Sequence, residues 1–231
     1  MQQKIRQLCA GFVHLFFPDL CEGCNRSLVA DESVLCLHCK QLLPRTGYHH
    51  IPENESAMRL AGRVPYRYGT SFAYFTEKGL LQHLLHGLKY RGKRKTAVFL
   101  GTEFAAELHT ISWISTVDLI IPIPLHAKKE RARGFNQSFV TAAAMGKYLQ
   151  IPVAEKGLLR VRHTESQTQK TRLERLENLS GAFQPNTEIK GKHVLLVDDV
   201  LTSGATLEAA AVTVLEAGAS GVSFATIAVA S

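Results

Sequence analysis

The chain has 231 residues, with 27 lysines and arginines against 20 aspartates and glutamates, and therefore a formal net charge of +7. Its 45% hydrophobic and 20% charged residues exclude a largely disordered chain, and its length allows one ordinary domain with a small appendage. The excess of positive charge favours a polyanionic partner such as a nucleotide, pyrophosphate or nucleic acid.

The first 17 residues contain an apolar stretch from Leu8 to Phe17, interrupted by His14. This stretch is shorter than the roughly 18 apolar residues needed to cross a bilayer, and no small-residue cleavage site follows it before Cys21. We expect a docking helix in a cytoplasmic protein with no transmembrane segment. Whether this helix packs on the chain itself, on a partner or peripherally on a membrane stays open.

Four of the five cysteines lie close together, in the pattern Cys21-x2-Cys24-x11-Cys36-x2-Cys39. Each pair can present two sulfurs from one tight turn, and tetrahedral four-sulfur coordination is typical of structural zinc. A module of about 30 residues buries too little apolar surface to fold alone, so bound metal would supply its folding energy. The spacing predicts a structural Zn²⁺ site, with two disulfides or an iron–sulfur cluster as alternatives.

From about Val64 the Cys-rich, turn-rich pattern gives way to alternating strand and helix signals. We expect an N-terminal helix and zinc-finger module over 1–60 and an α/β domain over 61–231. Strands alternating with helices predict a central, mostly parallel sheet flanked by helices. Strands are expected at 66–75, 118–124, 193–197 and 222–229, and helices at 80–90, 96–110, 136–149 and 204–217.

An apolar strand over 194–197 runs into Asp198 and Asp199, and a small, hydroxyl-rich turn then opens a helix. Parallel sheets bind ligands at the carboxyl edge, where this pattern would place both carboxylates. The turn suits a phosphate, while the carboxylates suit neutral ribose hydroxyls or a cation, so a ribose 5-phosphate fits both halves. The alternatives are a capping turn and a phospho-acceptor aspartate. The turn consists of Thr202, Ser203, Gly204, Ala205 and Thr206.

The segment 194–206 resembles the phosphoribosyl-pyrophosphate (PRPP) loop of type I phosphoribosyltransferases. The resemblance implies that Asp198 and Asp199 bind the ribose hydroxyls and that 202–206 bind the 5-phosphate. Upstream, a strand ends at Pro124 and supplies the cationic side chains that a pyrophosphate loop needs, although a solvated surface run is the alternative. Besides 202–206, the residues expected to bind PRPP are Lys89, Leu125, His126, Lys128 and Arg133.

Several separated patches, at 86–92, 131–138 and 162–167, resemble the ComF family of competence-associated proteins, also called the competence protein FC or GntX-like family. The resemblance runs from Cys21 to Val229 and implies a type I phosphoribosyltransferase fold with an N-terminal zinc finger. It also implies that the polar stretch 160–178 is a flexible hood over PRPP. Gln167 and Arg175 are the hood candidates, and Glu165-Ser166 departs from the commonest family form, in which prolines precede the glutamine.

The motifs, the positive charge and the resemblance together indicate two candidate functions. The first is a PRPP-binding competence protein that handles incoming single-stranded DNA in the cytoplasm, beside a competence helicase or other DNA-uptake proteins. Its candidate DNA contacts are a basic patch of Lys89, Arg91, Lys93, Arg94 and Lys95, and the aromatic residues Tyr66, Tyr68, Phe72, Tyr74 and Tyr90. Core packing is the more frequent role of such aromatic residues.

The second function is Mg²⁺-dependent transfer of 5-phosphoribosyl from PRPP to a base or amine. Pyrophosphate would leave C1′ of the ribose with electrostatic stabilisation and without a protein nucleophile. Amidophosphoribosyltransferase activity is not expected, because the first 60 residues offer a zinc module in place of a glutaminase domain.

Overall fold

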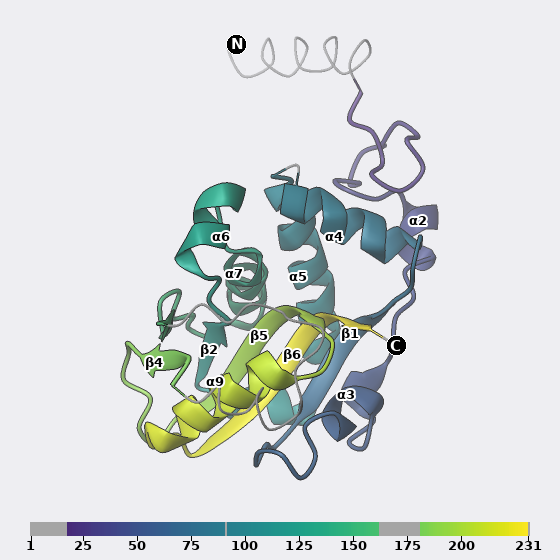
Figure 1. Cartoon of the computed structure of the whole chain (residues 1–231). Helices are drawn as coiled ribbons and strands as arrows, with labels where there is room; N and C mark the ends of the chain where they lie inside the picture. The colour runs from purple at the N-terminus through teal and green to yellow at the C-terminus, as the bar shows by residue number, and fades with distance from the viewer. Residues whose placement is uncertain (1–17, 91, 162–180, 231) are drawn as a thin grey trace, which may run out of the picture. The chain divides into compact units, whose positions relative to one another are not determined.

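The computed structural model describes residues 18–90, 92–161 and 181–230, and it divides into two compact units, Met1–Leu43 and Pro44–Ser231 (Figure 1). The boundary lies nearer the N-terminus than the expected one at residue 60. The reason is that the chain just after it pairs with β1 (Gly69–Phe75): Arg45 forms a bridge with Ala73, and the Asn54 side-chain amide donates to the Gly69 carbonyl.

Over residues 18–43, which the structure describes, the first unit is rich in turns and contains one short helix, α2 (Leu37–Gln41). Cys36 caps this helix, and a bridge joins Leu20 to Ser27. In this described part the buried apolar side chains are few, namely Leu28, Val34, Leu35 and Leu43 beside three of the cysteines. A core of this size leaves much of the folding energy to be supplied by something else.

The second unit is built on a four-stranded sheet of order β1-β6-β5-β2, in which every neighbouring pair is parallel. The parallel sheet that the alternating pattern predicts is confirmed. Because all four strands point the same way, their carboxyl ends meet at one edge. The remaining strands of this sheet are β2 (Leu119–Pro122), β5 (His193–Leu201) and β6 (Gly221–Ala230), and a separate antiparallel pair consists of β3 (Leu158–Arg160) and β4 (Phe183–Pro185).

Helices cover both faces of the sheet, with α9 (Ala205–Glu216) on one face and α5 (Arg94–Leu108) and α7 (Gln137–Leu149) on the other (Figure 1). Gly101 lets α5 and α7 approach closely, since a Cβ there would lie 2.7 Å from the Thr141 carbonyl oxygen. The other helical elements are η1 (Tyr48–His50), α3 (Glu55–Met58), α4 (Leu80–Tyr90), η2 (Ser112–Thr116) and α6 (Ala127–Arg133).

One hydrophobic core cluster lies between the sheet and α9. Alternate strand residues such as Val194 and Leu196 face it, because side chains alternate between the two faces of a strand. From α9 they meet Leu207, Ala211 and Val214. This packing fixes where β5 ends and α9 begins. No helix within the described residues is long and apolar enough to cross a membrane.

Two segments differ from the sequence expectation. The stretch expected to be a basic loop contains the helix α6, which starts where His126 Nδ1 accepts from the Lys128 N–H and ends at Gly134 with a φ of 77°. Strand β5 continues beyond Val197 to Leu201, because β6 offers ladder partners there: Thr226 lies opposite Asp198, and Ala228 and Val229 lie opposite Val200 and Leu201.

Candidate functional site

The two carboxylates occupy the last part of β5, and each receives a partner from a different helix. Asp198 Oδ1 accepts from the Ser138 hydroxyl of α7 at 3.0 Å and from the Asp199 N–H at 2.8 Å. Asp199 Oδ2 lies 3.2 Å from Nζ of Lys89, in the last turn of α4. Residues far apart in the sequence therefore meet at the carboxyl edge of the sheet.

The carboxyl group of Asp198 is a weaker acid than an ordinary aspartate. Burial, reinforced by the negative charge of Asp199, raises the pKa of Asp198 to about 7, while the Asp199 N–H, the Ser138 hydroxyl and the charge of Lys89 act in the opposite direction. The carboxyl group can therefore gain or lose a proton close to neutral pH. Two adjacent carboxyls that resist joint ionisation are suited to neutral hydroxyl partners.

The hydroxyl-rich turn leads directly from the carboxylates into α9. Gly204 caps the helix with a left-handed φ of 77°, and Thr202 and Ser203 are exposed. A small cavity of about 30 Å³ is lined by Asp198 and by residues 202–206. The first N–H groups of α9, a helix of twelve residues, have no partner within the helix, so an anion in this turn would meet them.

Two arginines that the sequence did not single out hold this turn in place. Arg59 Nη1 donates to the Thr202 carbonyl at 2.5 Å, and Arg63 Nη1 donates to the Ser203 carbonyl at 2.5 Å. Arg63 also forms an ion pair with the buried Glu208 of α9. Nothing in the local sequence signals these contacts, because they join residues about 140 positions apart.

The same segment continues this support away from the turn. Arg59 Nη2 pairs with Glu55 Oε1 at 2.5 Å, and Glu55 Oε2 accepts from the Tyr48 hydroxyl at 3.2 Å. A continuous set of polar contacts therefore runs from Tyr48 to the Thr202 carbonyl.

In the expected pyrophosphate loop, part of the segment is helical and some of its polar side chains are bonded within the protein. Leu125 and His126 lie between β2 and α6, Lys128 is exposed on α6, and Arg133 Nη1 donates to Gln137 Oε1 at 3.0 Å. Asn136 caps α7 and donates to the Ile123 carbonyl, which ties α7 to the end of β2. All of these residues follow the carboxyl end of β2, at the same edge as Asp198.

The basic patch is only partly available to a ligand. Lys89 is already paired with Asp199, and the Arg94 guanidinium donates to the Gly134 carbonyl at 2.9 Å and lies 4.8 Å from the Phe135 ring centre. Lys95 is exposed on the first turn of α5, and Lys93 immediately precedes that helix. Arg91 lies outside the described residues.

The hood candidates Gln167 and Arg175 also lie outside the described residues. Just before that stretch, Arg160 ends β3 and packs over Phe183 of β4, at 5.7 Å from the ring centre. Burial lowers the pKa of Arg160, and the negative charge of Asp198 opposes that change, so the guanidinium lies within electrostatic reach of the carboxyl pair. Arg160 is the first residue of the expected hood stretch 160–178, although it was not among the individually expected site residues.

Of the aromatic residues considered for base stacking, Phe72 is buried, and Tyr66 and Tyr74 are partly buried and packed against other rings. Phe72 is fully buried against Phe104, Tyr66 packs edge-on against Phe224, and Tyr74 packs edge-on against Tyr48. Tyr68 differs, because 37% of it is exposed and it stacks on Trp113. The side chain of Tyr90 lies outside the described residues.

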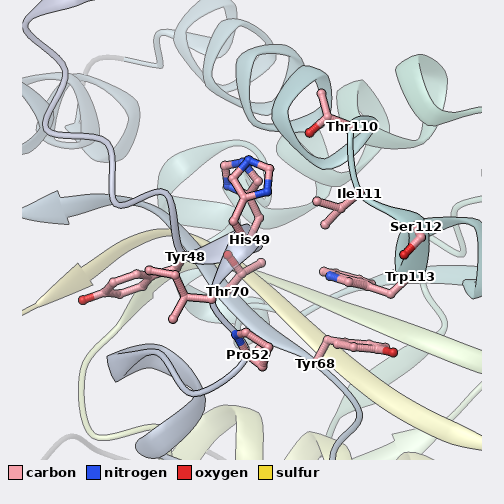
Figure 2. Close-up of a pocket in the computed structure, with 12 residues that line it drawn as sticks. Tyr48, His49, Pro52, Tyr68, Thr70, Thr110, Ile111, Ser112 and Trp113 are labelled. Atoms are coloured by element: carbon pink, nitrogen blue, oxygen red, sulfur yellow. The ribbon is translucent and has the colours of Figure 1, made fainter.

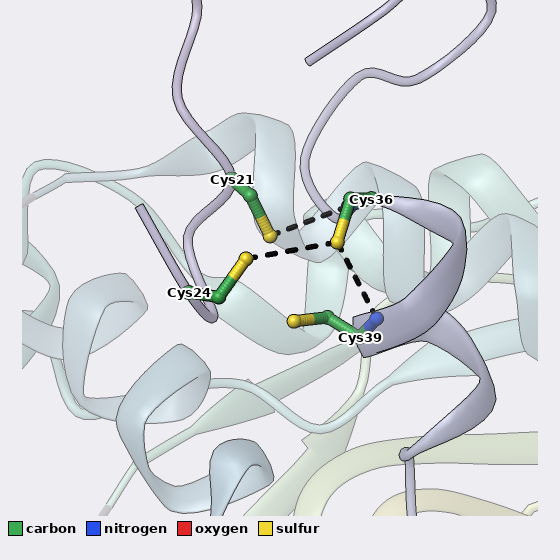
Figure 3. Close-up of side chains that lie close together, drawn as sticks. All are labelled: Cys21, Cys24, Cys36 and Cys39. Carbon is green, nitrogen blue, oxygen red and sulfur yellow. Dashed lines mark hydrogen bonds between the residues drawn. The ribbon is translucent and has the colours of Figure 1, made fainter. Parts of the chain in front are cut away.

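In the first unit, four cysteines form one cluster of free thiols whose sulfurs all lie within 4.8 Å of one another (Figure 3). The Sγ atoms of Cys24 and Cys36 are 3.7 Å apart, close to the edge of about 3.8 Å that Zn–S bonds of 2.3 Å give a tetrahedron. The cluster also includes Cys21 and Cys39.

Backbone N–H groups point at these sulfurs. Cys21 Sγ accepts from the N–H groups of Gly23 at 3.4 Å and of Cys36 at 3.3 Å. Burial alone would raise the pKa of Cys21, but the hydrogen bonds from Cys36, Cys24 and Gly23 outweigh it and lower the pKa to about 6. Metal-binding thiolates need such stabilisation, so the donor set fits a metal ion.

Comparison with known proteins relates this chain to a phosphoribosyltransferase domain family and to proteins named for DNA utilization and competence. A family model described as "Phosphoribosyl transferase domain" matches residues 136–230. The chain is 28% identical over 206 residues to "DNA utilization protein YhgH" of Escherichia coli (strain K12), covering 88% of this chain and 87% of that protein. It is 29% identical over 206 residues to "Competence protein ComFC" of Bacillus subtilis (strain 168), covering 88% and 82%.

Among solved structures, the glutamine PRPP amidotransferase from B. subtilis, complexed with ADP and GMP, aligns at 22% identity with a TM-score of 0.40. The alignment covers 56% of this chain and spans about a quarter (25%) of that one.

Proposed function

Since the chain belongs to the ComF/YhgH family of phosphoribosyltransferase-domain proteins with an N-terminal four-cysteine cluster, we propose that it binds PRPP or a related 5-phosphoribosyl group at the carboxyl edge and handles single-stranded DNA in the cytoplasm. Asp198 and Asp199 would accept from the ribose hydroxyls, and 202–206 would hold the 5-phosphate. The family relatives whose names refer to DNA utilization and competence support the DNA part of the proposal.

One observation carries the ligand proposal. Asp198 and the turn 202–206 border the same small cavity, at the point where β5 feeds α9. Carboxylates for hydroxyls and helix N–H groups for a phosphate therefore lie next to each other, which matches the two halves of a ribose 5-phosphate. Mg²⁺ suits this ligand because oxygen atoms of pyrophosphate and ribose are the donors it prefers, and it would neutralise leaving pyrophosphate.

Calorimetry with PRPP and Mg²⁺ tests the ligand. The unmodified protein should release or absorb heat on binding, and absence of a heat signal under several buffers and temperatures, together with no thermal stabilisation, would contradict the proposal. Replacing Asp198 or Asp199 with Asn removes a negative charge from the site. The control Glu216→Gln removes a negative charge from the exposed far end of α9 and should bind PRPP normally.

Binding of single-stranded DNA is tested by charge reversal. Lys93→Glu with Lys95→Glu alters the basic patch but keeps Arg94, which has structural contacts. We expect weaker oligonucleotide binding and a shallower salt dependence, by about 0.7 in slope for each phosphate that the protein no longer neutralises. Lys190→Glu with Lys192→Glu makes the same charge change in the turn before β5 and should have a smaller effect. No oligonucleotide binding by the unmodified protein at low salt would remove this part of the proposal.

Phosphoribosyl transfer to a base or amine is the second candidate function. It is favoured by Asp198, whose pKa of about 7 would let it exchange a proton with an acceptor near neutral pH. Incubation with PRPP, Mg²⁺ and candidate acceptors, followed by measurement of released pyrophosphate, distinguishes turnover from binding. Release that depends on an acceptor and disappears in Asp198→Asn supports transfer.

We also propose that the four-cysteine cluster holds a structural Zn²⁺. The ion would contribute folding energy to a unit with a small core. Purified protein should contain about one zinc per chain, and Cys36→Ser should lose it. An iron–sulfur cluster would instead give visible absorption and iron.

A further inference from the structure

A second pocket lies at the opposite, amino edge of the sheet (Figure 2). It has a volume of about 450 Å³, and it is bordered by η1, by the start of β1 and by η2, the turn of helix that precedes β2. Pockets of roughly 300–1,000 Å³ are typical of small-molecule sites. None of the residues assigned to the PRPP site lines it.

One wall of this pocket is aromatic. Tyr68 and Trp113 stack with their ring centres 4.7 Å apart and an angle of 9° between the planes. Figure 2 shows the two parallel rings on one side of the pocket and Thr70 and His49 on the other. Tyr68 is 37% exposed, so it is not a core residue and part of its surface is open to a ligand. Stacked rings of this kind form a platform for another flat ring.

The opposite wall carries two polar atoms without a hydrogen bond, one of which lies within ion-pair distance of Glu107. Within the described residues, Thr70 Oγ1 has no hydrogen-bond partner although only 1% of the residue is exposed. His49 Nδ1 likewise has no hydrogen bond, and the nearest acid, Glu107, lies 3.5 Å away without forming one. Burial lowers the pKa of His49, with a smaller contribution from His50, and this favours the neutral ring, which has one donor and one acceptor nitrogen.

We propose that this pocket binds a nucleobase, stacked on the Tyr68–Trp113 platform with its polar edge toward Thr70 and His49. A nucleobase has a flat π face that can stack on the aromatic wall. It also has donors and acceptors along its rim that can bond the polar wall. An aliphatic side chain would leave the Thr70 hydroxyl unpaired, at a cost, and would not use the flat rings. Such stacking is independent of base identity, because every base has a π face.

The site is separate from the PRPP site and goes beyond the proposed function. Strand β1 runs from Gly69, at the pocket, to Phe75 at the carboxyl edge, a path of about 20 Å at 3.3 Å per residue. A base bound here therefore cannot be the acceptor in phosphoribosyl transfer at Asp198. The base can come from a free nucleoside or from a single strand, and the two sources share the same chemistry.

Trp113 provides a direct readout, because it is the only tryptophan in the sequence. Titration with deoxynucleosides and, in parallel, with a short single-stranded oligonucleotide should quench its fluorescence in a saturable way, after correction against free tryptophan for absorption by the bases. An abasic oligonucleotide should not quench it. Quenching by the oligonucleotide alone identifies a strand as the source, and comparable quenching by nucleosides identifies free bases as sufficient.

Two variants test the walls. Thr70→Val keeps the shape of the side chain and should weaken the quenching titration about tenfold, the usual cost of leaving a ligand's polar group unpaired. Tyr68→Leu should weaken it by a similar factor through lost stacking. Tyr148→Leu is the matched control, because Tyr148 is 46% exposed on α7 beside His109 and does not line the pocket.

The inference is overturned if neither nucleosides nor the oligonucleotide quench Trp113, if an aromatic peptide does so instead, or if both wall variants bind like the unmodified protein. PRPP binding measured on the same variants separates this result from the proposed function. Thr70→Val should bind PRPP normally, whereas Asp198→Asn with Asp199→Asn should keep the quenching of Trp113 and lose PRPP.

Discussion

The two edges of the parallel sheet differ in how their polar groups are satisfied. At the carboxyl edge, Asp198 accepts from Ser138, Asp199 pairs with Lys89, and Arg63 holds the Ser203 carbonyl. At the amino edge, the Thr70 hydroxyl has no partner within the described residues. The first edge is organised before any ligand arrives, so removing one group leaves another unpaired. At the second edge, the Thr70 hydroxyl would gain its hydrogen bond only from the proposed ligand, so removing this hydroxyl leaves no other group of the free protein unpaired.

The largest effect is expected from Asp198→Asn with Asp199→Asn. Two carboxyl acceptors for the ribose hydroxyls are removed together, and a hydrogen bond to the charged one contributes about 1.5–3 kcal/mol, with about 0.5–1.5 kcal/mol from the other. PRPP affinity measured by calorimetry should therefore fall by about a hundredfold. Unchanged affinity would remove the role given to the pair.

Arg63→Gln should come next, with a loss of about 3 kcal/mol in the free energy of unfolding, because it leaves the buried Glu208 without its cation. Denaturant unfolding measures this loss. The double variant Arg63→Gln with Glu208→Gln should regain much of the stability but still bind PRPP more weakly, because the Ser203 carbonyl remains unsupported. If the single variant is as stable as the unmodified protein, the support of the turn is not energetically significant.

The raised pKa of Asp198 makes the stability of the protein depend on pH. Its folded-state pKa of about 7 lies above the usual value of about 4, so the folded protein binds this proton more tightly than the unfolded chain. The contribution of Asp198 to stability is therefore present below pH 4 and is lost as the pH rises to about 7. Asp198→Asn should raise stability by about 4 kcal/mol at pH 8, since each pKa unit corresponds to about 1.4 kcal/mol, and by less than about 1 kcal/mol at pH 4. A gain that is equal at both pH values would contradict the raised pKa.

The smallest expected effect compares two neighbouring hydroxyls on β1. Thr70→Val should stabilise the protein by about 0.5–1 kcal/mol, since it removes a buried hydroxyl without a partner. Ser71→Ala should destabilise it by about 1–2 kcal/mol, because Ser71 Oγ bonds with the Ser56 and Thr226 hydroxyls at 2.7 and 2.6 Å. Thermal unfolding of both variants checks the sign, and a loss of stability in Thr70→Val would indicate an unrecognised partner.

Sequence patterns predicted the parallel sheet and most of its helices, because periodicity reports which face of an element is buried. The helix α4 (Leu80–Tyr90) matches the expected bounds. The patterns failed where the ends of elements depend on other segments. Asp198 and Asp199 lie inside β5 because β6 pairs with Asp198 and with Val200 and Leu201 beyond them, and α6 formed where charged residues gave no apolar stripe.

The candidate site was predictable only in part. Strand and turn chemistry pointed to Asp198, Asp199 and 202–206, which are neighbours in the sequence. Lys89 was expected to bind PRPP or DNA, and its pairing with Asp199 is a tertiary contact that no local pattern contains. The support from Arg59 and Arg63 and the polar wall of the second pocket arise in the same way, from segments brought together by the fold.

Tyr48 lines the amino-edge pocket, and its hydroxyl begins the polar contacts that pass through Glu55 and Arg59 to the Thr202 carbonyl. A ligand that shifts Tyr48 would change how firmly the 202–206 turn is held. Thermodynamic linkage then makes the effect mutual: whatever factor a bound base applies to the affinity for PRPP, PRPP applies to the affinity for that base. An affinity for either ligand would then describe the protein only at a stated concentration of the other.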